Sequence, residues 1–160
     1  MASMLSLESE IDQDRSLTTV QSVPVPVVLQ LTGGKPLRIS GELVAECSSW
    51  TASASSWHDL QIFVRDTGEF VVALRSCRGD AGESDVFHAR AFASRDEAML
   101  WLQEFDPTAD MVADLDPSDR RISAPEIALR AAALRQRMDR LQMQYRSMIG
   151  ELLYRLDVGG

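Results

Sequence analysis

The last quarter of the chain, residues 123–157, constrains the fold more than any other stretch. Ser123 and Glu126 have the spacing of a helix start in which each caps an exposed amide, and Pro125 is tolerated in a first helical turn. Apolar or small residues then recur at alternating steps of four and three: Ile127, Ala131, Leu134, Met138, Leu141, Tyr145, Met148 and Leu152. This heptad period predicts one long helix that buries a narrow stripe, here called the inner stripe, against a partner.

The length of this helix indicates a second chain. At a rise of 1.5 Å per residue the helix is about 45 Å long. A small preceding domain is too narrow to cover that length, so we expect the eight residues of the inner stripe to form a homodimer interface. The pattern is compatible with both parallel and antiparallel pairing.

The residues before the helix predict an antiparallel sheet of about five strands. The segment 23–27 alternates Val and Pro, which forces an extended backbone into an edge strand over 27–31. A second strand over 37–47 alternates, and we expect its apolar residues on one face: Leu37, Ile39, Leu43, Ala45 and Cys47. Strands over 60–65 and 70–74 flank the turn Asp66-Thr67-Gly68, and a fifth strand covers 86–92.

A short helix and a linker complete the predicted organisation. Ser94 to Glu97 form a capping box, followed by one apolar face that we expect to lie across the sheet: Ala98, Trp101, Leu102 and Phe105. Residues 106–122 are acidic and contain two Asp-Pro pairs, so the long helix need not pack on the sheet. The prediction is an α+β protein with a polar tail (1–22), a sheet-plus-helix domain (23–105), an acidic linker (106–122) and a dimerisation helix (123–157).

Charge is distributed unevenly along the chain. The net charge is −8, and residues 126–160 hold six Arg against four carboxylates, so the first 125 residues carry −10. An acidic body argues against an extended nucleic-acid footprint and fits a protein partner with a basic surface. Solubility is the simpler explanation of the acidity. Residues 1–20 lack the pattern of a signal peptide and no apolar run reaches membrane-spanning length, so we expect a cytoplasmic protein that does not enter a membrane.

The sequence contains no recognisable catalytic or metal-binding motif. Thr32-Gly33-Gly34-Lys35 lacks the first Gly of a phosphate loop and fits a hairpin turn, and Arg78-Gly79-Asp80 fits a loop. The possible metal ligands Cys47, His58, Cys77 and His88 include no close pair, so we predict no metal and no cofactor. An enzyme would need a site assembled from scattered residues, of which the most crowded are His58, Asp59, Asp85 and His88. We therefore predict that the protein is not an enzyme.

Candidate partner contacts lie on the second strand and around the small-residue loop 51–56. They are Glu42, Glu46, Trp50, Trp57 and His58. Two alternatives remain. One is a nucleic-acid-binding regulator that uses the arginines of the long helix: Arg130, Arg135, Arg137, Arg140 and Arg146. The other is a secretion-type chaperone, since such proteins are also small, acidic and dimeric.

The order of these segments over residues 37–105 carries a resemblance. The pieces Gly41-Glu42-Leu43-Val44-Ala45, Trp57-His58-Asp59-Leu60, Thr67-Gly68-Glu69-Phe70 and Ser94-Arg95-Asp96-Glu97-Ala98 resemble the layout of small uncharacterised accessory proteins of plasmids and other mobile elements. The resemblance implies a bacterial accessory protein and brings no known active site. We predict a non-enzymatic, homodimeric protein-binding accessory, regulator or inhibitor, with a nucleic-acid-handling machine as one possible target.

Overall fold

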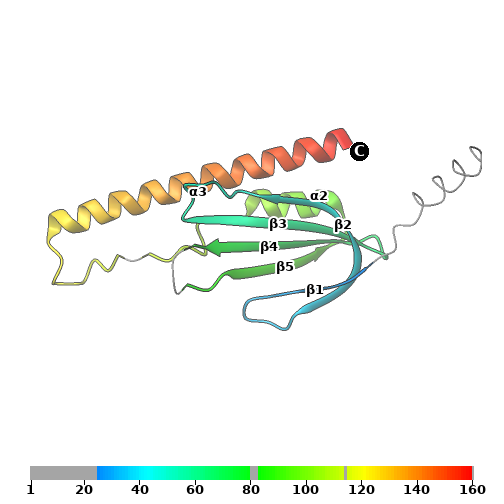
Figure 1. Ribbon diagram of the computed structural model, residues 1–160, viewed down its shortest axis with the longest axis horizontal. Coiled ribbons are helices and arrows are strands. Elements are labelled where there is room, and N and C mark those ends of the chain that lie inside the picture. The colour runs from blue at the N-terminus through cyan, green and yellow to red at the C-terminus, as the bar shows by residue number, and fades with distance from the viewer. Residues whose placement is uncertain (1–24, 80–82, 114, 160) are drawn as a thin grey trace, which may run out of the picture.

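The residues that the structure describes form a five-stranded antiparallel sheet with two helices on one face, which confirms the predicted α+β class (Figure 1). The computed structural model describes residues 25–79, 83–113 and 115–159, so the polar tail predicted over 1–22 lies outside the described residues. The elements are β1 (Val25–Leu29), β2 (Leu37–Ser48), β3 (Ser56–Arg65), β4 (Phe70–Arg78), β5 (Val86–Phe92), α2 (Arg95–Glu104) and α3 (Ala124–Gly159).

The strands follow one another across the sheet in chain order, as consecutive hairpins. The turn between β3 and β4 needs Gly68, whose φ of +87° is accessible to Gly and strained for other residues. Its amide donates a hydrogen bond to the carbonyl of Arg65 at 2.9 Å. The Asp66-Thr67-Gly68 turn predicted from the sequence is therefore confirmed.

The sheet curls until its first hairpin reaches its last strand. The amide of Thr32 donates to the carbonyl of Phe87 at 2.9 Å, and the amide of Phe87 donates to Oγ1 of Thr32 at 2.8 Å. Figure 1 shows β1 turned away from the plane of β3 and β4. The concave side of the curl holds a small core of its own, made of Leu29, Ile39, Phe63 and Val71.

A β-bulge in β2 corrects the predicted alternation of that strand. Leu43 is opposite Phe63 on the concave side, whereas Ala45 is opposite Ile62 on the helix-covered side, with the register shifting between them. A bulge inserts one residue and so reverses the alternation beyond it. The expectation that Leu37 to Cys47 place all their apolar residues on one face is therefore wrong beyond Leu43.

The main core lies between the sheet and the two helices. α2 begins at Ser94, whose hydroxyl accepts the amide of Glu97 at 3.3 Å, as the capping pattern predicts. The buried residues come from β3, β4, α2 and α3: Leu60, Ile62, Val72, Leu74, Ala98, Met99, Leu102, Tyr145, Met148, Ile149 and Leu152. The hydroxyl of Tyr145 also donates to the carbonyl of Leu102, which joins α3 to α2.

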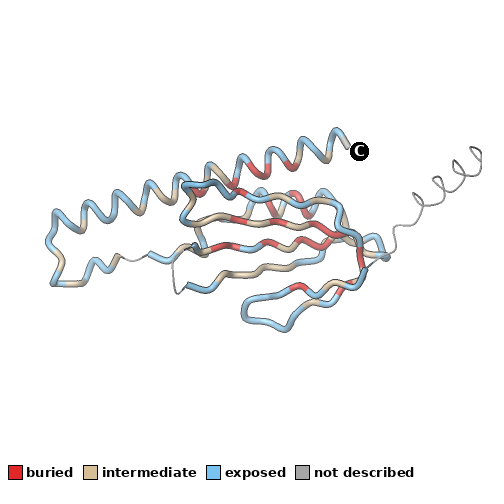
Figure 2. Tube along the Cα trace, in the orientation of Figure 1, coloured by how far each residue is buried: buried red, intermediate tan, exposed pale blue. Residues whose placement is uncertain are grey.

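Only the C-terminal half of α3 is covered by the sheet and α2, as Figure 2 shows by its buried residues. Leu141, Tyr145, Met148 and Leu152 are 1–4 % exposed within a single chain. Their assignment to a dimer interface is therefore wrong, because the chain doubles back after α2 and returns this half of the helix to its own sheet. The other half of the inner stripe is less covered: Ile127, Leu134 and Met138 are partly exposed and Ala131 is exposed.

The segment before α3 is tied to the sheet near its start. Nε of Arg78 donates to the carbonyl of Asp110 at 2.9 Å, and Pro107 is buried. The prediction of a linker that leaves the helix free of the sheet is wrong for this part, since these contacts position the turn that leads into α3.

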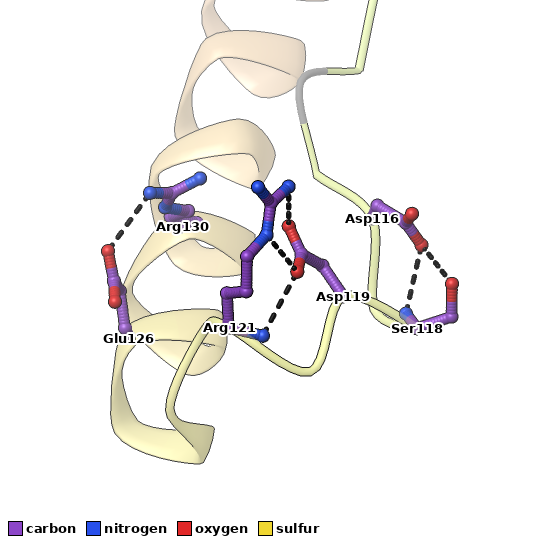
Figure 3. A network of polar contacts seen from close by, with 6 residues as sticks. All are labelled: Asp116, Ser118, Asp119, Arg121, Glu126 and Arg130. Atoms are coloured by element: carbon purple, nitrogen blue, oxygen red, sulfur yellow. Dashed lines mark hydrogen bonds and ion pairs between the residues drawn. The ribbon is translucent and has the colours of Figure 1, made fainter.

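Local hydrogen bonds shape the turn at the start of α3 (Figure 3). The carboxylate of Asp116 accepts the amide of Ser118 at 2.9 Å, and that of Asp119 accepts the amide of Arg121 at 3.0 Å. Inside the helix, Arg130 donates to Glu126 at 2.9 Å, one turn away. The projecting end of α3 therefore begins at a defined polar turn.

Candidate functional site

The predicted partner contacts do not form one surface. His58 is 1 % exposed, because its strand position faces the helices instead of solvent, so its assignment as a partner contact is wrong. Glu42 and Glu46 lie on opposite faces of the sheet, since the β2 bulge separates them. Trp50 is 58 % exposed and Trp57 is partly buried, which leaves Trp50 as the accessible aromatic residue of the set.

His58 is a buried imidazole packed against aromatic rings. Its ring centroid is 5.2 Å from that of Tyr145 and 6.0 Å from that of Phe105, both in edge-on contacts. Neither ring nitrogen has a hydrogen-bond partner among the described residues. Burial lowers the pKa of His58 from 6.5 to about 4, so the ring is neutral at pH 7.

A carboxylate outside the predicted site residues joins two strands to the segment after α2. Oδ2 of Asp110 lies 2.7 Å from Nε2 of His88 and accepts the hydroxyl of Ser76 at 2.6 Å. Burial alone would raise the pKa of Asp110, but the bonds from Ser76 and His88 hold it below its ordinary value. Because Ser76 bonds to the carboxylate and not to the imidazole, the arrangement lacks the serine–histidine bond of an activated nucleophile. Its evident role is to hold this segment against the sheet.

The scattered acid–base candidates do not come together. Asp59 faces the concave side of the curled sheet, whereas its neighbour His58 faces the helices. Asp85 is engaged elsewhere, since it accepts Nε of Arg75 at 2.8 Å. Sequence reasoning grouped these residues by proximity along the chain, but the alternation of strand β3 sends neighbours to opposite faces.

The four possible metal ligands are also separated. Cys47 lies opposite Leu60 on the helix-covered side, and Cys77 lies opposite Trp57 on the other side. Burial raises the pKa of Cys47 to about 11 and that of Cys77 to about 12, so both thiols are protonated at pH 7. Across residues 25–79, 83–113 and 115–159, no group of three His, Cys, Asp or Glu side chains is placed to share a metal ion.

A cavity of about 550 Å³ opens at one end of the curled sheet. Its lining includes the apolar Leu29 and Ala73, the carboxylates of Glu46 and Asp59 and the guanidinium of Arg75. Asp59 accepts bonds from Ser48 and Cys77, and Glu46 accepts one from Gln61 at 3.5 Å, all neutral donors. Arg75 lies directly opposite Asp59 on β4, and the two charges interact.

The outer face of α3 carries the most exposed large apolar side chains among the residues that the structure describes. Four large residues on it are about 70 % exposed: Leu129, Met143, Tyr154 and Val158, at 72, 71, 70 and 69 %. Their spacing places them on one side of the helix, opposite the inner stripe. The exposed small residues between them are Ala132, Ala133, Ser147 and Gly150, and the exposed polar residues on the same side of the helix are Gln136, Arg140 and Glu151. These eleven residues define the outer face.

Gly150 distinguishes the outer face from an ordinary solvated surface. A Gly inside a helix costs about 1 kcal/mol relative to Ala. A Cβ built on Gly150 would meet no atom within 4 Å, so nothing in the described chain requires Gly at this position. Close approach of another molecule to the helix at this position would explain why the residue is Gly. Sequence reasoning followed the more regular inner stripe and missed this face, although its spacing was visible in the sequence.

No protein-family model, curated protein or solved structure matches the chain. Within the described residues, neither helix combines the length and apolar character needed to cross a membrane.

Proposed function

We propose that this protein is a non-enzymatic protein-binding accessory whose binding surface is the outer face of α3. The supporting observation is a line of exposed large apolar residues that runs from Leu129 to Val158, a distance of about 44 Å along the helix. Exposed Gln136 and Arg140 separate Leu129 from Met143 on this face. Exposed apolar residues grouped on one side of a helix are nevertheless typical of protein contacts.

The first partner we propose is a second copy of the chain. The sequence predicted a homodimer because the whole inner stripe was expected to need a second chain. That reason does not hold for the half of α3 that packs on its own sheet. The outer face gives a different reason, because it is exposed along both halves of the helix.

Light scattering over a range of concentrations tests this assembly. Met143→Lys places a charge at the middle of the outer face, and Val28→Lys is a matched control on β1, where Val28 is 59 % exposed. We expect wild type and Val28→Lys to rise above the 17.7 kDa mass of one chain, and Met143→Lys to remain there. A mass of one chain for all three proteins at every concentration would refute the homodimer.

A second partner is favoured by Glu46 in the lining of the sheet cavity. Glu46 accepts a hydrogen bond from the neutral Gln61, so a Lys or Arg side chain of a basic protein would give it a charged partner. Proteins that handle nucleic acid carry such basic surfaces, and binding one of them would make this chain its regulator or inhibitor.

A titration with an Arg- and Lys-rich peptide tests the second partner. Binding should weaken with salt and with Glu46→Gln, while Glu42→Gln, on the other face of β2, should leave it unchanged. Equal loss with both substitutions would indicate a general charge effect and remove the sheet cavity from the proposal.

Nucleic-acid binding by α3 has weaker support. Arg130 and Arg155 are each paired with a Glu of the same helix, at 2.9 and 3.2 Å. Arg135 and Arg140 are five residues apart, which at about 100° per residue places them on different sides of the helix. The arginines therefore do not form one stripe along α3 that could follow a phosphate backbone.

A further inference from the structure

The outer face of α3 also carries information about how two copies would be arranged. We propose that two chains pair their outer faces antiparallel, about a twofold axis at Met143; this inference rests on the proposed protein-binding function of the same face. Met143 is 71 % exposed and lies near the middle of the line from Leu129 to Val158. In this arrangement, residues at equal distances before and after Met143 face each other across the pair.

Side-chain size supports the antiparallel arrangement. Tyr154 lies eleven residues after Met143 and would face Ala132, eleven residues before it. Gly150 would likewise face Gln136, seven residues away on the other side. Val158 would face Ala128, so two of the four large residues of the outer face meet an Ala, which lets the helices approach closely at these levels. Met143 would meet its own copy at the axis, and Leu129 would face Asp157.

Parallel pairing in register would place each residue against its own copy. Tyr154 would then meet Tyr154 and Gly150 would meet Gly150, which forces the helices apart at one level and leaves a gap at the next. The size pattern disfavours this alternative.

Charges beside the outer face support the same register. Asp139 precedes Met143 by four residues and Arg146 follows it by three, and both are exposed. They lie on the same side of the outer face, since seven residues make about two turns of helix. Antiparallel pairing therefore brings each Asp139 next to the partner's Arg146 on both sides of the axis. Exposed ion pairs add little affinity, so their effect is on orientation.

The bodies of the two chains would not collide. The outer face points away from the sheet, because the opposite side of α3 packs on the sheet and α2. In Figure 1, α3 lies along one edge of the molecule with the strands on its other side. Two copies would therefore place their sheets on opposite sides of the helix pair.

The size of the contact predicts its strength. A strip about 44 Å long and about 10 Å wide covers on the order of 450 Å² of each helix. A stable interface buries about 800 Å² per partner, and smaller ones are transient. We therefore expect a weak dimer that forms as the protein concentration rises.

Disulfide crosslinking of single-cysteine substitutions in the full chain tests the register. Met143→Cys should crosslink to itself under mild oxidation, because the two positions meet at the axis. Leu129→Cys alone should not, since its two copies would lie about 42 Å apart and a disulfide needs Cα atoms within about 7 Å. The double substitution Leu129→Cys with Val158→Cys should crosslink again. Wild type, which has Cys77 buried and Cys47 partly buried, is the control for the native thiols.

Each other outcome overturns the arrangement in a recognisable way. Self-crosslinking of both Met143→Cys and Leu129→Cys would indicate parallel pairing. Failure of Met143→Cys to crosslink, in a protein that light scattering shows to be a dimer, would move the interface elsewhere and leave self-association intact. A protein that remains at 17.7 kDa at every concentration would overturn the proposed self-association together with its register.

Discussion

Replacing His58 by Leu should make the protein less sensitive to acid. The imidazole is 1 % exposed and neither ring nitrogen has a hydrogen-bond partner among the described residues. Burial lowers its pKa from 6.5 to about 4, opposed by the charge of Asp110 and assisted by that of His88. The folded state therefore resists protonation of a group that the unfolded chain protonates readily. Leu carries no such group, and it removes two unsatisfied polar atoms from the core.

The pKa difference gives the size and the sign of the effect. Between pH 6.5 and pH 4 the unfolded chain binds a proton that the folded chain does not, so the free energy of unfolding falls as the pH is lowered. The full difference corresponds to about 3 kcal/mol, of which about 2 kcal/mol is lost by pH 5. Asp110 has a lowered pKa and so contributes in a separate range, below pH 3.8.

Urea unfolding at pH 7 and pH 5, on dilute protein, measures this effect. Wild type should lose about 2 kcal/mol between the two pH values through this group, and His58→Leu should lose correspondingly less. His88→Gln is the matched control, since it removes the other imidazole and retains a donor for Asp110. It should keep most of the wild-type loss, because burial and not the charge of His88 is the main cause of the lowered pKa of His58. An equal loss of stability in wild type and His58→Leu would refute the assignment of this acid sensitivity to the buried ring.

Three further substitutions test other parts of the structure. Asp110→Ala should lower the free energy of unfolding by about 1–3 kcal/mol, because it leaves His88 without its acceptor; a change within error in urea unfolding would contradict the role of Asp110 in holding the segment after α2 against the sheet. Thr32→Val should cost about 1 kcal/mol and speed hydrogen exchange at the amide of Phe87, which loses its acceptor; an unchanged exchange rate would show that this contact does not close the sheet. Gly150→Ala should stabilise the single chain by about 1 kcal/mol yet weaken self-association in light scattering, and a tighter dimer would argue against close helix contact at this position.

The sequence was sufficient to predict the strands, the helices and the α+β fold class, because strand alternation, turn residues and helix caps depend on residues close together in the chain. The turn at Gly68 and the cap at Ser94 follow from such signals. The β2 bulge was not predictable in the same way, since a single inserted residue leaves a strand that still appears to alternate. Its consequence was nevertheless large, as it moved Glu42 and Glu46 to opposite faces.

The candidate site was less predictable because it depends on contacts between distant segments. Asp110 was assigned to a linker, and only the folded chain brings it to Ser76, 34 residues away in sequence. The inner stripe was recognised as a buried face, but a heptad pattern does not say which surface buries it. The position of His58 follows from the same contact, since the return of α3 over the sheet covers its ring.

Oxidation of two methionines of α3, followed by mass spectrometry, tests the central claim about this helix most directly. Met143 is 71 % exposed on the outer face, whereas Met148 is 3 % exposed against the sheet. In dilute protein we predict rapid oxidation of Met143 by peroxide and slow oxidation of Met148, and at high concentration we predict that Met143 also becomes protected. Rapid oxidation of Met148 in dilute protein, or a Met143 rate that does not change with concentration, would contradict the account.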